Sequence, residues 1–298
     1  MKSNSKPEDR RIPYISRGTV GIISRAVMSF SGKDILLVEG NPDQKTYNKI
    51  VQALGKTNIY VLPVYEKGRY LDSGDVEMLG EPNDVSPKLS IILLVKRCFA
   101  REWAKGSPLN KFFGIVDKDW FFEEEMECVN DSILTYSTPM SDEDWKTYFF
   151  DAVSNGRLIT TDTNDVETLI FKFDFDAVKK ACNFAASKYN LDQLKDEALN
   201  RARKAGKKQL KKEKKYLELE DKSFFDIDDD WAFCKGHSLV EKFRDLVDKD
   251  KQHFKTEKQF INSVINNISP ANFTDSTVYK FIDSIEPNPD WHLNTITF

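Results

Sequence analysis

Several patterns that mark familiar classes of protein are absent from this sequence. It contains no G-x-x-x-x-G-K-[ST] motif, so we do not expect the chain to hydrolyse ATP by itself. The four cysteines are widely separated and form no C-x-x-C pair, which argues against a zinc knuckle or a disulfide framework and fits a reducing cytosol. The three histidines are isolated, and no serine or cysteine stands in a nucleophile motif.

The sequence also lacks the long apolar segments of membrane and secreted proteins. No apolar run approaches the roughly 18 residues that a membrane span needs. The N-terminal stretch MKSNSKPEDRR has no apolar signal segment, so we expect a cytoplasmic protein that does not associate with membranes. The net charge of −4 excludes no class of partner, because a nucleic-acid-binding protein shows its basic surface locally rather than in its total charge.

Short apolar runs alternate with helical patterns over the first part of the chain. Strands are predicted at 34–40, 58–65, 111–119, 132–137 and 157–162. A helix is predicted directly after the first strand, and another is predicted to begin at Ser86-Pro87. Strands that alternate with helices predict an α/β fold with a mostly parallel sheet and helices on both faces.

Strand patterns fade beyond about residue 173, and helical patterns take over. Helices are predicted at 174–190, 191–220, 237–249, 256–269 and 274–286. We therefore predict a flexible N-terminal arm (1–12), an α/β domain (13–173) and a helical C-terminal region (174–298).

Carboxylates follow three of the predicted strands, at the edge of an α/β sheet where ligands bind. The three groups are Glu39 with Asp43, Asp117 with Asp119, and Asp162 with Asp165 and Glu167. Any one group alone could consist of turn residues and helix caps, and Asp165 or Asn164 could cap a helix that contains Glu167.

Together, the three groups indicate a cation site. Carboxylates that are brought together repel one another, and their pKa values rise unless a cation offsets the charge. Oxygen ligands without histidine or cysteine suit Mg²⁺ or Mn²⁺ better than zinc. Two such ions can hold a scissile phosphate between them.

The residues of these groups carry a family resemblance. LLVEGNPD followed by GIVDKDW resembles the TOPRIM domain, the Rossmann-like fold shared by topoisomerases, DnaG-type primases and OLD-family nucleases. Glu39-Gly40 and Asp117-Lys118-Asp119 match its strand-terminal glutamate and its DxD, and Asp43 matches the extra aspartate of OLD-like members. TNDVET, with Glu167, and the later CKGHSLVEKF are similar to segments of a bacterial TOPRIM-like family of formerly unknown function.

The resemblance implies a Mg²⁺- or Mn²⁺-dependent nuclease. In that role Glu39 would be a metal ligand or general base, and Asp117 and Asp119 would hold one metal. Asp43 and Glu167 would help to hold the other. Lys235 would stabilise the charge of the transition state, whereas the competing candidate Lys118 is better explained as a surface lysine.

A strongly basic segment in the C-terminal region predicts a nucleic-acid-binding helix. Its basic side chains occupy most of the circumference, so we expect this helix to project from the body of the protein. The alternatives are a solvated helix face or a site for an acidic partner protein. The predicted nucleic-acid-binding residues are Arg201, Arg203, Lys204, Lys207, Lys208, Lys211 and Lys212.

Some members of the TOPRIM-like family act beside an ABC-type ATPase in anti-phage systems such as PARIS. The resemblance therefore implies a toxic effector nuclease, controlled by an ATPase partner and active as a homodimer. Its substrate would be RNA such as tRNA, or DNA; the sequence does not decide between them. Two alternatives stay open: a non-catalytic TOPRIM-fold binding or regulatory subunit, and a primase-like phosphotransfer enzyme.

Overall fold

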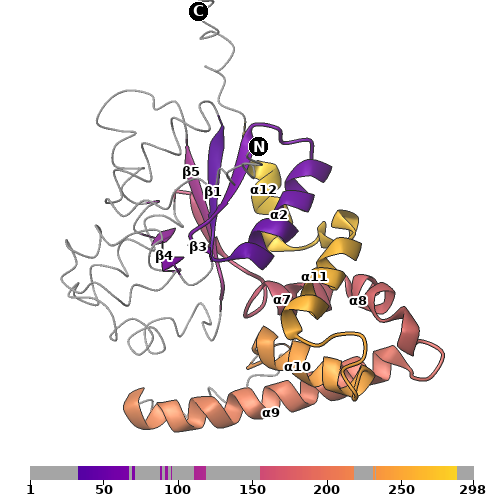
Figure 1. Cartoon of the computed structure of the whole chain (residues 1–298). Helices are drawn as coiled ribbons and strands as arrows, with labels where there is room; N and C mark the ends of the chain where they lie inside the picture. The colour runs from indigo at the N-terminus through magenta and orange to yellow at the C-terminus, as the bar shows by residue number, and fades with distance from the viewer. Residues whose placement is uncertain are drawn as a thin grey trace, which may run out of the picture.

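The fold was analysed in a computed structural model of the chain (Figure 1). It describes residues 33–66, 69–70, 88, 91–92, 95, 111–118, 155–217, 231 and 233–286, with the backbone alone at 65–66, 69–70 and 209–217. None of the described helices is long and apolar enough to cross a membrane.

A four-stranded parallel sheet forms the centre of the described fold. Its strands are β1 (Asp34–Val38), β2 (Ile59–Pro63), β5 (Phe112–Val116) and β6 (Leu158–Thr160), in the order β2-β1-β5-β6. This confirms the predicted α/β class and its parallel sheet. The strand predicted at 132–137 lies outside the described residues. A short antiparallel pair, β3 (Tyr65–Glu66) with β4 (Arg69–Tyr70), follows β2.

The two central strands are buried because both faces of the sheet are covered. Every residue of β1 and β5 is buried, as expected for central strands of a parallel sheet. Phe113 of β5 packs edge-on against Phe281, at 6.1 Å between ring centroids. A side chain at the next residue, Gly114, would lie on the opposite face of the sheet. A Cβ atom on Gly114 would come within 2.6 Å of the Ile91 side chain, so this face needs glycine for the close approach of a helical segment.

Helices follow the sheet strands and then fill the C-terminal region. They are α2 (Asn41–Ala53), α7 (Val166–Phe173), α8 (Phe175–Ala181), η1 (Asn183–Ala185), α9 (Leu191–Leu217), α10 (Gly236–Val247), α11 (Glu257–Asn267), η3 (Pro270–Phe273) and α12 (Thr277–Ser284). The helices predicted from the sequence in this part of the chain are confirmed within a few residues at their ends, except that 174–190 divides into α8 and η1.

One continuous set of buried apolar side chains joins the sheet to the C-terminal helices. It runs from Leu36 of β1 through α2 and α7 to Ile282 of α12. Helix α10 packs along α9, α11 packs on α8, and both α11 and α12 contact α2 (Figure 1). Phe243 of α10 packs edge-on against Phe171 and Phe175, with ring centroids 5.4 and 5.7 Å apart.

Lysines of α2 reinforce this contact at the surface. Lys45 Nζ donates to Asn262 Oδ1 at 2.6 Å, and Lys49 Nζ donates to the carbonyl oxygen of Asn266 at 2.9 Å. Just after the helix, Lys56 Nζ donates to the carbonyl oxygen of Asp283 at 2.6 Å. These bonds satisfy side-chain and carbonyl oxygens of α11 and α12, two elements more than 200 residues further along the chain.

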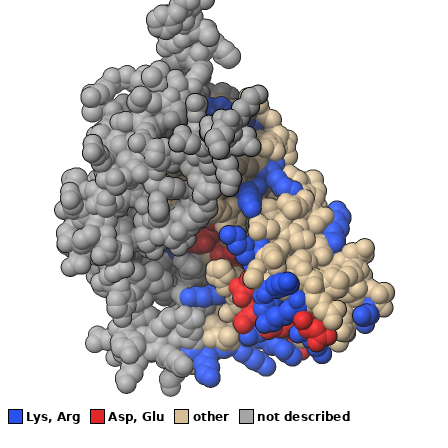
Figure 2. Space-filling view, viewed as in Figure 1, with Lys and Arg blue, Asp and Glu red and all other residues tan. Residues whose placement is uncertain are grey.

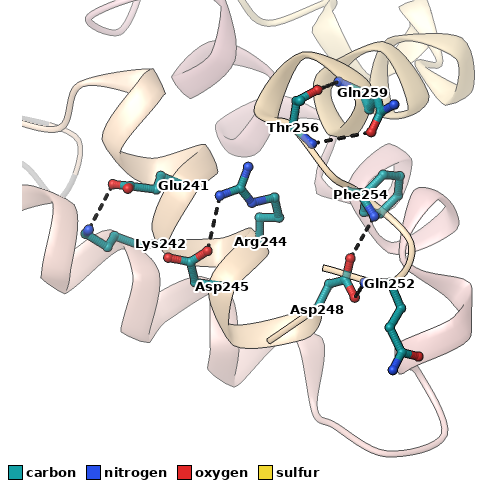
Figure 3. Close-up of polar contacts among 9 residues, drawn as sticks. All are labelled: Glu241, Lys242, Arg244, Asp245, Asp248, Gln252, Phe254, Thr256 and Gln259. Carbon is teal, nitrogen blue, oxygen red and sulfur yellow. Dashed lines mark hydrogen bonds and ion pairs between the residues drawn. The ribbon is translucent and has the colours of Figure 1, made fainter. Parts of the chain in front are cut away.

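A buried aspartate organises the turn between α10 and α11 (Figure 3). Asp248 follows the last turn of α10, and its carboxylate accepts the backbone N–H groups of Gln252, His253 and Phe254 at 2.7–3.0 Å. Thr256 and Gln259 then cap the start of α11. The carboxylate thus accepts hydrogen bonds from three backbone N–H groups of a loop that belongs to no helix or sheet.

Replacing Asp248 by alanine is expected to destabilise the protein by roughly 2–4 kcal/mol, because it leaves several backbone N–H groups without an acceptor. Urea unfolding measures this loss. Asp250→Ala, at an exposed position of the same turn, is the matched control and should change stability by less than about 0.5 kcal/mol. Equal stability of the two variants would contradict the assigned role of Asp248.

Candidate functional site

The strand order places two predicted site residues at a topological switch point. From β1 the chain passes to β2 on one side, whereas from β5 it passes to β6 on the other side. Ligands of open α/β sheets bind beyond the carboxyl ends of the strands at such a point. Glu39 directly follows β1, and Asp117 directly follows β5.

Glu39 and Asp117 are in direct contact. The backbone N–H of Asp117 donates to Glu39 Oε1 at 2.8 Å, and both side chains are half-buried. The next backbone N–H, that of Lys118, donates to Thr161 Oγ1 at 2.9 Å beyond β6. The ends of three neighbouring strands are therefore held together by hydrogen bonds between a backbone donor and a side-chain acceptor.

Asp43 brings a buried carboxylate to the same edge. It lies in the first turn of α2, is 6% exposed, and accepts the backbone N–H of Gly40 at 2.9 Å. A carboxylate near a helix N-terminus is usually stabilised in its charged form. Here burial raises the pKa of Asp43 well above its ordinary value, and the charges of Glu167 and Glu39 raise it further.

Glu167 approaches Asp43 from a second helix. It lies in the first turn of α7, which packs against α2, and it is 8% exposed. Burial, followed by the charge of Asp165, raises the pKa of Glu167 to about 7, and His237 opposes this shift. The structure therefore brings Glu39, Asp43, Asp117 and Glu167 together, although their segments are far apart in the chain.

The other two acidic residues of the third group have structural roles. Asp165, one of the two residues that the sequence offered as a cap, is the N-cap of α7 and accepts the backbone N–H of Thr168 at 2.9 Å. Asp162 accepts the backbone N–H of Thr277 at 2.8 Å at the start of α12. Each of these carboxylates accepts a backbone N–H group in the first turn of a helix and so stabilises the start of that helix.

Lys235 lies next to this group because the segments around residues 165 and 235 are in contact. It is the N-cap residue of α10 and is half-buried. Beside it, the Gly236 backbone N–H donates to Asp165 Oδ2 at 2.5 Å, and Asn164 Nδ2 donates to the carbonyl oxygen of Cys234 at 2.7 Å. The two segments that resemble one TOPRIM-like family therefore lie side by side.

Four of the five carboxylates predicted as metal ligands lie within the described structure. Asp119 lies outside the described residues. Within the described ranges, no three Asp, Glu, His or Cys side chains are arranged to hold one metal ion. One oxygen of Glu39 and one of Asp43 accept backbone N–H groups instead. The donor chemistry still suits a hard divalent cation, because the ligands are carboxyl oxygens and a nearby cation would favour the charged forms of Asp43 and Glu167, whose pKa values burial raises.

The basic helix α9 does not project along its whole length. Its Ala198, Ala202 and Gly206 are buried against the body, where α9 packs along α10. The expectation of a projecting helix is therefore wrong through Gly206, because these small side chains form a packing face. The C-terminal end of α9 extends beyond α10 (Figure 1).

The predicted nucleic-acid-binding residues on α9 divide between its faces. Arg201, Lys204 and Lys208 are exposed, and Arg201 pairs with Glu197 one turn earlier. Arg203 and Lys207 are half-buried, and Lys207 Nζ lies 5.0 Å from the ring centroid of Phe233. The side chains of Lys211 and Lys212 are outside the described part. Figure 2 shows basic side chains along the lower edge of this view, where α9 lies.

Tyr47 is a residue of this site that the sequence did not reveal. Its position fits the apolar periodicity of α2, so the sequence indicates a core residue only. In the structure it is fully buried, and within the described residues its hydroxyl has no hydrogen-bond partner. Burial and then the charges of all four clustered carboxylates raise its pKa well above the ordinary value. The available signal was its spacing, four residues after Asp43, which places both on one helix face.

Gly236→Ala is expected to destabilise the protein by about 1–3 kcal/mol, because the added Cβ would lie 2.6 Å from Glu167 Cβ and would also overlap the Asp165 carboxylate. Thermal or urea unfolding measures the loss. Gly40→Ala is the matched control, since a Cβ there meets only ordinary contacts of 3.4 Å or more, and it should cost less than about 1 kcal/mol. A larger loss in Gly40→Ala would contradict the close packing of these segments.

The raised pKa of Glu167 predicts a pH-dependent stability in the absence of divalent ions. Between the ordinary value of 4.5 and the folded value of about 7, the folded protein binds the proton more tightly than the unfolded chain. The free energy of unfolding should therefore fall as the pH rises through this window. Glu167→Gln removes this loss and should gain up to roughly 3 kcal/mol relative to wild type above pH 7. Urea unfolding in EDTA measures both profiles, and parallel profiles would contradict the burial of this charge.

Comparison of the chain with models of known protein families, with curated proteins and with solved structures finds no match.

Proposed function

We propose that this chain is a divalent-metal-dependent nuclease with a TOPRIM-like catalytic centre, which cleaves phosphodiester bonds of RNA such as tRNA, or of DNA. One observation carries the proposal: Glu39, Asp43, Asp117 and Glu167 converge at the switch point of the parallel sheet. Buried carboxylates that repel one another favour a bound cation, because the cation offsets a charge that burial makes unfavourable.

Mg²⁺ or Mn²⁺ is the cation that these ligands suit. Asp43, Glu167, Asp117 and Asp119 are the residues that would hold it, with Glu39 as a further ligand or as the general base. When bound, the ion supplies positive charge for the phosphate oxygens and lowers the pKa of a bound water. The carboxylates keep this edge of the sheet acidic, so that an anionic substrate is favoured only once cations are present.

The protein's own cations complete the proposed site. Lys235, at the start of α10 and beside the Glu167 segment, is the candidate that stabilises charge on the phosphate in the transition state. Arg201, Lys204 and Lys208 of α9 are exposed, and we propose that they bind the phosphate backbone outside the site. Such contacts give affinity that falls with salt and does not depend on sequence.

The biological setting that we propose is anti-phage defence. The chain would be a toxic effector, held inactive by an ABC-type ATPase partner and active as a homodimer after release. The motif resemblance supports this setting. A partner that hydrolyses ATP would supply the control that the chain cannot supply alone.

The proposal is tested by incubating the purified protein with labelled tRNA and with labelled DNA, in Mg²⁺ and in EDTA. Cleavage is expected in Mg²⁺ only, and Glu39→Gln should lower the rate by roughly 10²–10⁴-fold. This variant keeps an oxygen that can accept the Asp117 N–H, so it removes the charge while the contact between the strands can persist. Asp176→Asn, at an exposed position of α8, is the control and should cleave as fast as wild type.

A non-catalytic binding subunit is the second candidate. It is favoured by the finding that the described carboxylates are not arranged around one ion. The two candidates differ when the activated ATPase partner is added to the same assay. Salt-dependent binding of nucleic acid without any cleavage would establish the binding subunit, and cleavage that persists in Glu39→Gln would overturn the assigned site.

A further inference from the structure

Two consecutive residues hold the peptide groups on either side of Lys235. Asn164 Nδ2 donates to the carbonyl oxygen of Cys234 at 2.7 Å, which fixes the peptide group before Lys235. Asp165 Oδ2 accepts the backbone N–H of Gly236 at 2.5 Å, which fixes the peptide group after it. The backbone of Lys235 is therefore held at both ends by one short segment, the loop between β6 and α7.

The bond from Asn164 is shielded from water. Asn164 is 4% exposed and Cys234 is 0% exposed. If the donor were removed, water could not easily replace it at a buried carbonyl oxygen, so the loss would weaken the attachment of this peptide group. The bond therefore holds the segment that leads into Lys235.

The chain reaches Lys235 through a residue with an unusual backbone conformation. Phe233 has a φ of 62°, in the left-handed region that a bulky side chain seldom adopts, and it is 0% exposed. Such a conformation persists only where the surrounding structure enforces it, and residues of this kind cluster at functional sites. Here the buried Phe233 side chain and the bond to Cys234 hold the segment in place.

Asp165 also connects Lys235 to the acidic edge of the sheet. Its other oxygen, Oδ1, accepts the backbone N–H of Thr168 at 2.9 Å and so caps α7, the helix that carries Glu167. The two segments approach closely, since a Cβ atom on Gly236 would lie 2.6 Å from Glu167 Cβ. One carboxylate thus fixes both the start of α7 and the residue after Lys235.

We propose that Asn164 and Asp165 are positioning residues, which fix the backbone of Lys235 beside Glu167 so that the lysine can act on the substrate phosphate. The inference rests on the proposed function, because it needs a phosphate on which Lys235 acts. It deepens that function, since the sequence offered Asn164 only as an alternative helix cap. A lysine side chain is long and flexible, so a fixed backbone is what limits the positions that its amine can reach.

Asn164 is the position to test, because substitution of Asp165 would also remove the cap of α7. Asn164→Asp replaces the donor by an acceptor oxygen in a side chain of the same shape, and Asn164→Ala removes the donor without adding charge. Where Asn164→Asp fails to fold, Asn164→Ala decides. Asn267→Asp is the matched control, because Asn267 Nδ2 donates to the carbonyl oxygen of Ser263 at 2.9 Å within α11.

The experiment follows cleavage by the full-length protein in single turnover, with the protein in excess over the labelled substrate that wild type cuts. Both Asn164 variants are expected to lower the maximal rate constant by roughly 10–100-fold, because a catalytic group that is slightly displaced loses much of its effect. The protein concentration at half-saturation should stay close to that of wild type. Asn267→Asp should keep the wild-type rate.

A second pair of variants separates positioning from general damage. In a Lys235→Ala background, the Asn164 substitutions should lower the rate no further, because Asn164 acts through Lys235. A merely structural defect would lower the remaining activity of Lys235→Ala by the same factor as it lowers that of wild type.

The outcomes distinguish this inference from the proposed function. Asn164 variants that cleave at the wild-type rate, or that lose the same factor with and without Lys235, would overturn the positioning role. An equally large loss in Asn267→Asp would overturn it too. Wild-type cleavage by Lys235→Ala would overturn the role of Lys235 and this inference but leave the nuclease standing. A wild-type protein that cleaves neither tRNA nor DNA would overturn both.

Discussion

The crowding of four carboxylates at one edge of a parallel sheet is the interaction around which the described structure is organised. Asp43 and Glu167 lie in the first turns of α2 and α7, where the helix N-termini favour negative charge. Hydrogen bonds from the backbone to Glu39 and Asp43 add further stabilisation. Even so, burial outweighs these contributions, since the pKa values of Asp43 and Glu167 stay raised. Burial therefore favours the protonated forms of these two carboxyl groups, and a cation at this edge would favour their charged forms.

Local chemistry made part of this structure predictable from the sequence. The apolar runs DILLV and FFGIV predicted strands, which are buried in the structure, and TNDVET predicted a helix capped by Asp165 or Asn164. The contact between Glu39 and Asp117 depends on strand order, which no local pattern encodes. The approach of Gly236 to Glu167 depends in the same way on packing between segments some 70 residues apart. Tyr47 was hidden because helical periodicity treats an aromatic position as core and ignores its hydroxyl.

The basic helix shows how a charge pattern can conceal a packing pattern. Lysine and arginine dominate the composition of α9, yet Ala198, Ala202 and Gly206 recur every four residues and form one narrow face. Small side chains let the backbones of α9 and α10 approach closely. The long stems of Arg203 and Lys207 flank this face, and Lys207 covers the ring of Phe233. The first part of α9 is therefore packed against the body of the protein, while the charged ends of its exposed side chains lie at the surface.

Lysines in α2 and just after it bind α11 and α12, two helices that are synthesised much later. Helix α2, which carries Asp43 and Tyr47, is synthesised early, but its outer face is covered by residues that are translated more than 200 positions later. Glu167 is also made long after Glu39. A nascent chain on the ribosome therefore carries Glu39 and Asp43 before Glu167 is made, and the outer face of α2 stays uncovered until α11 and α12 have been synthesised.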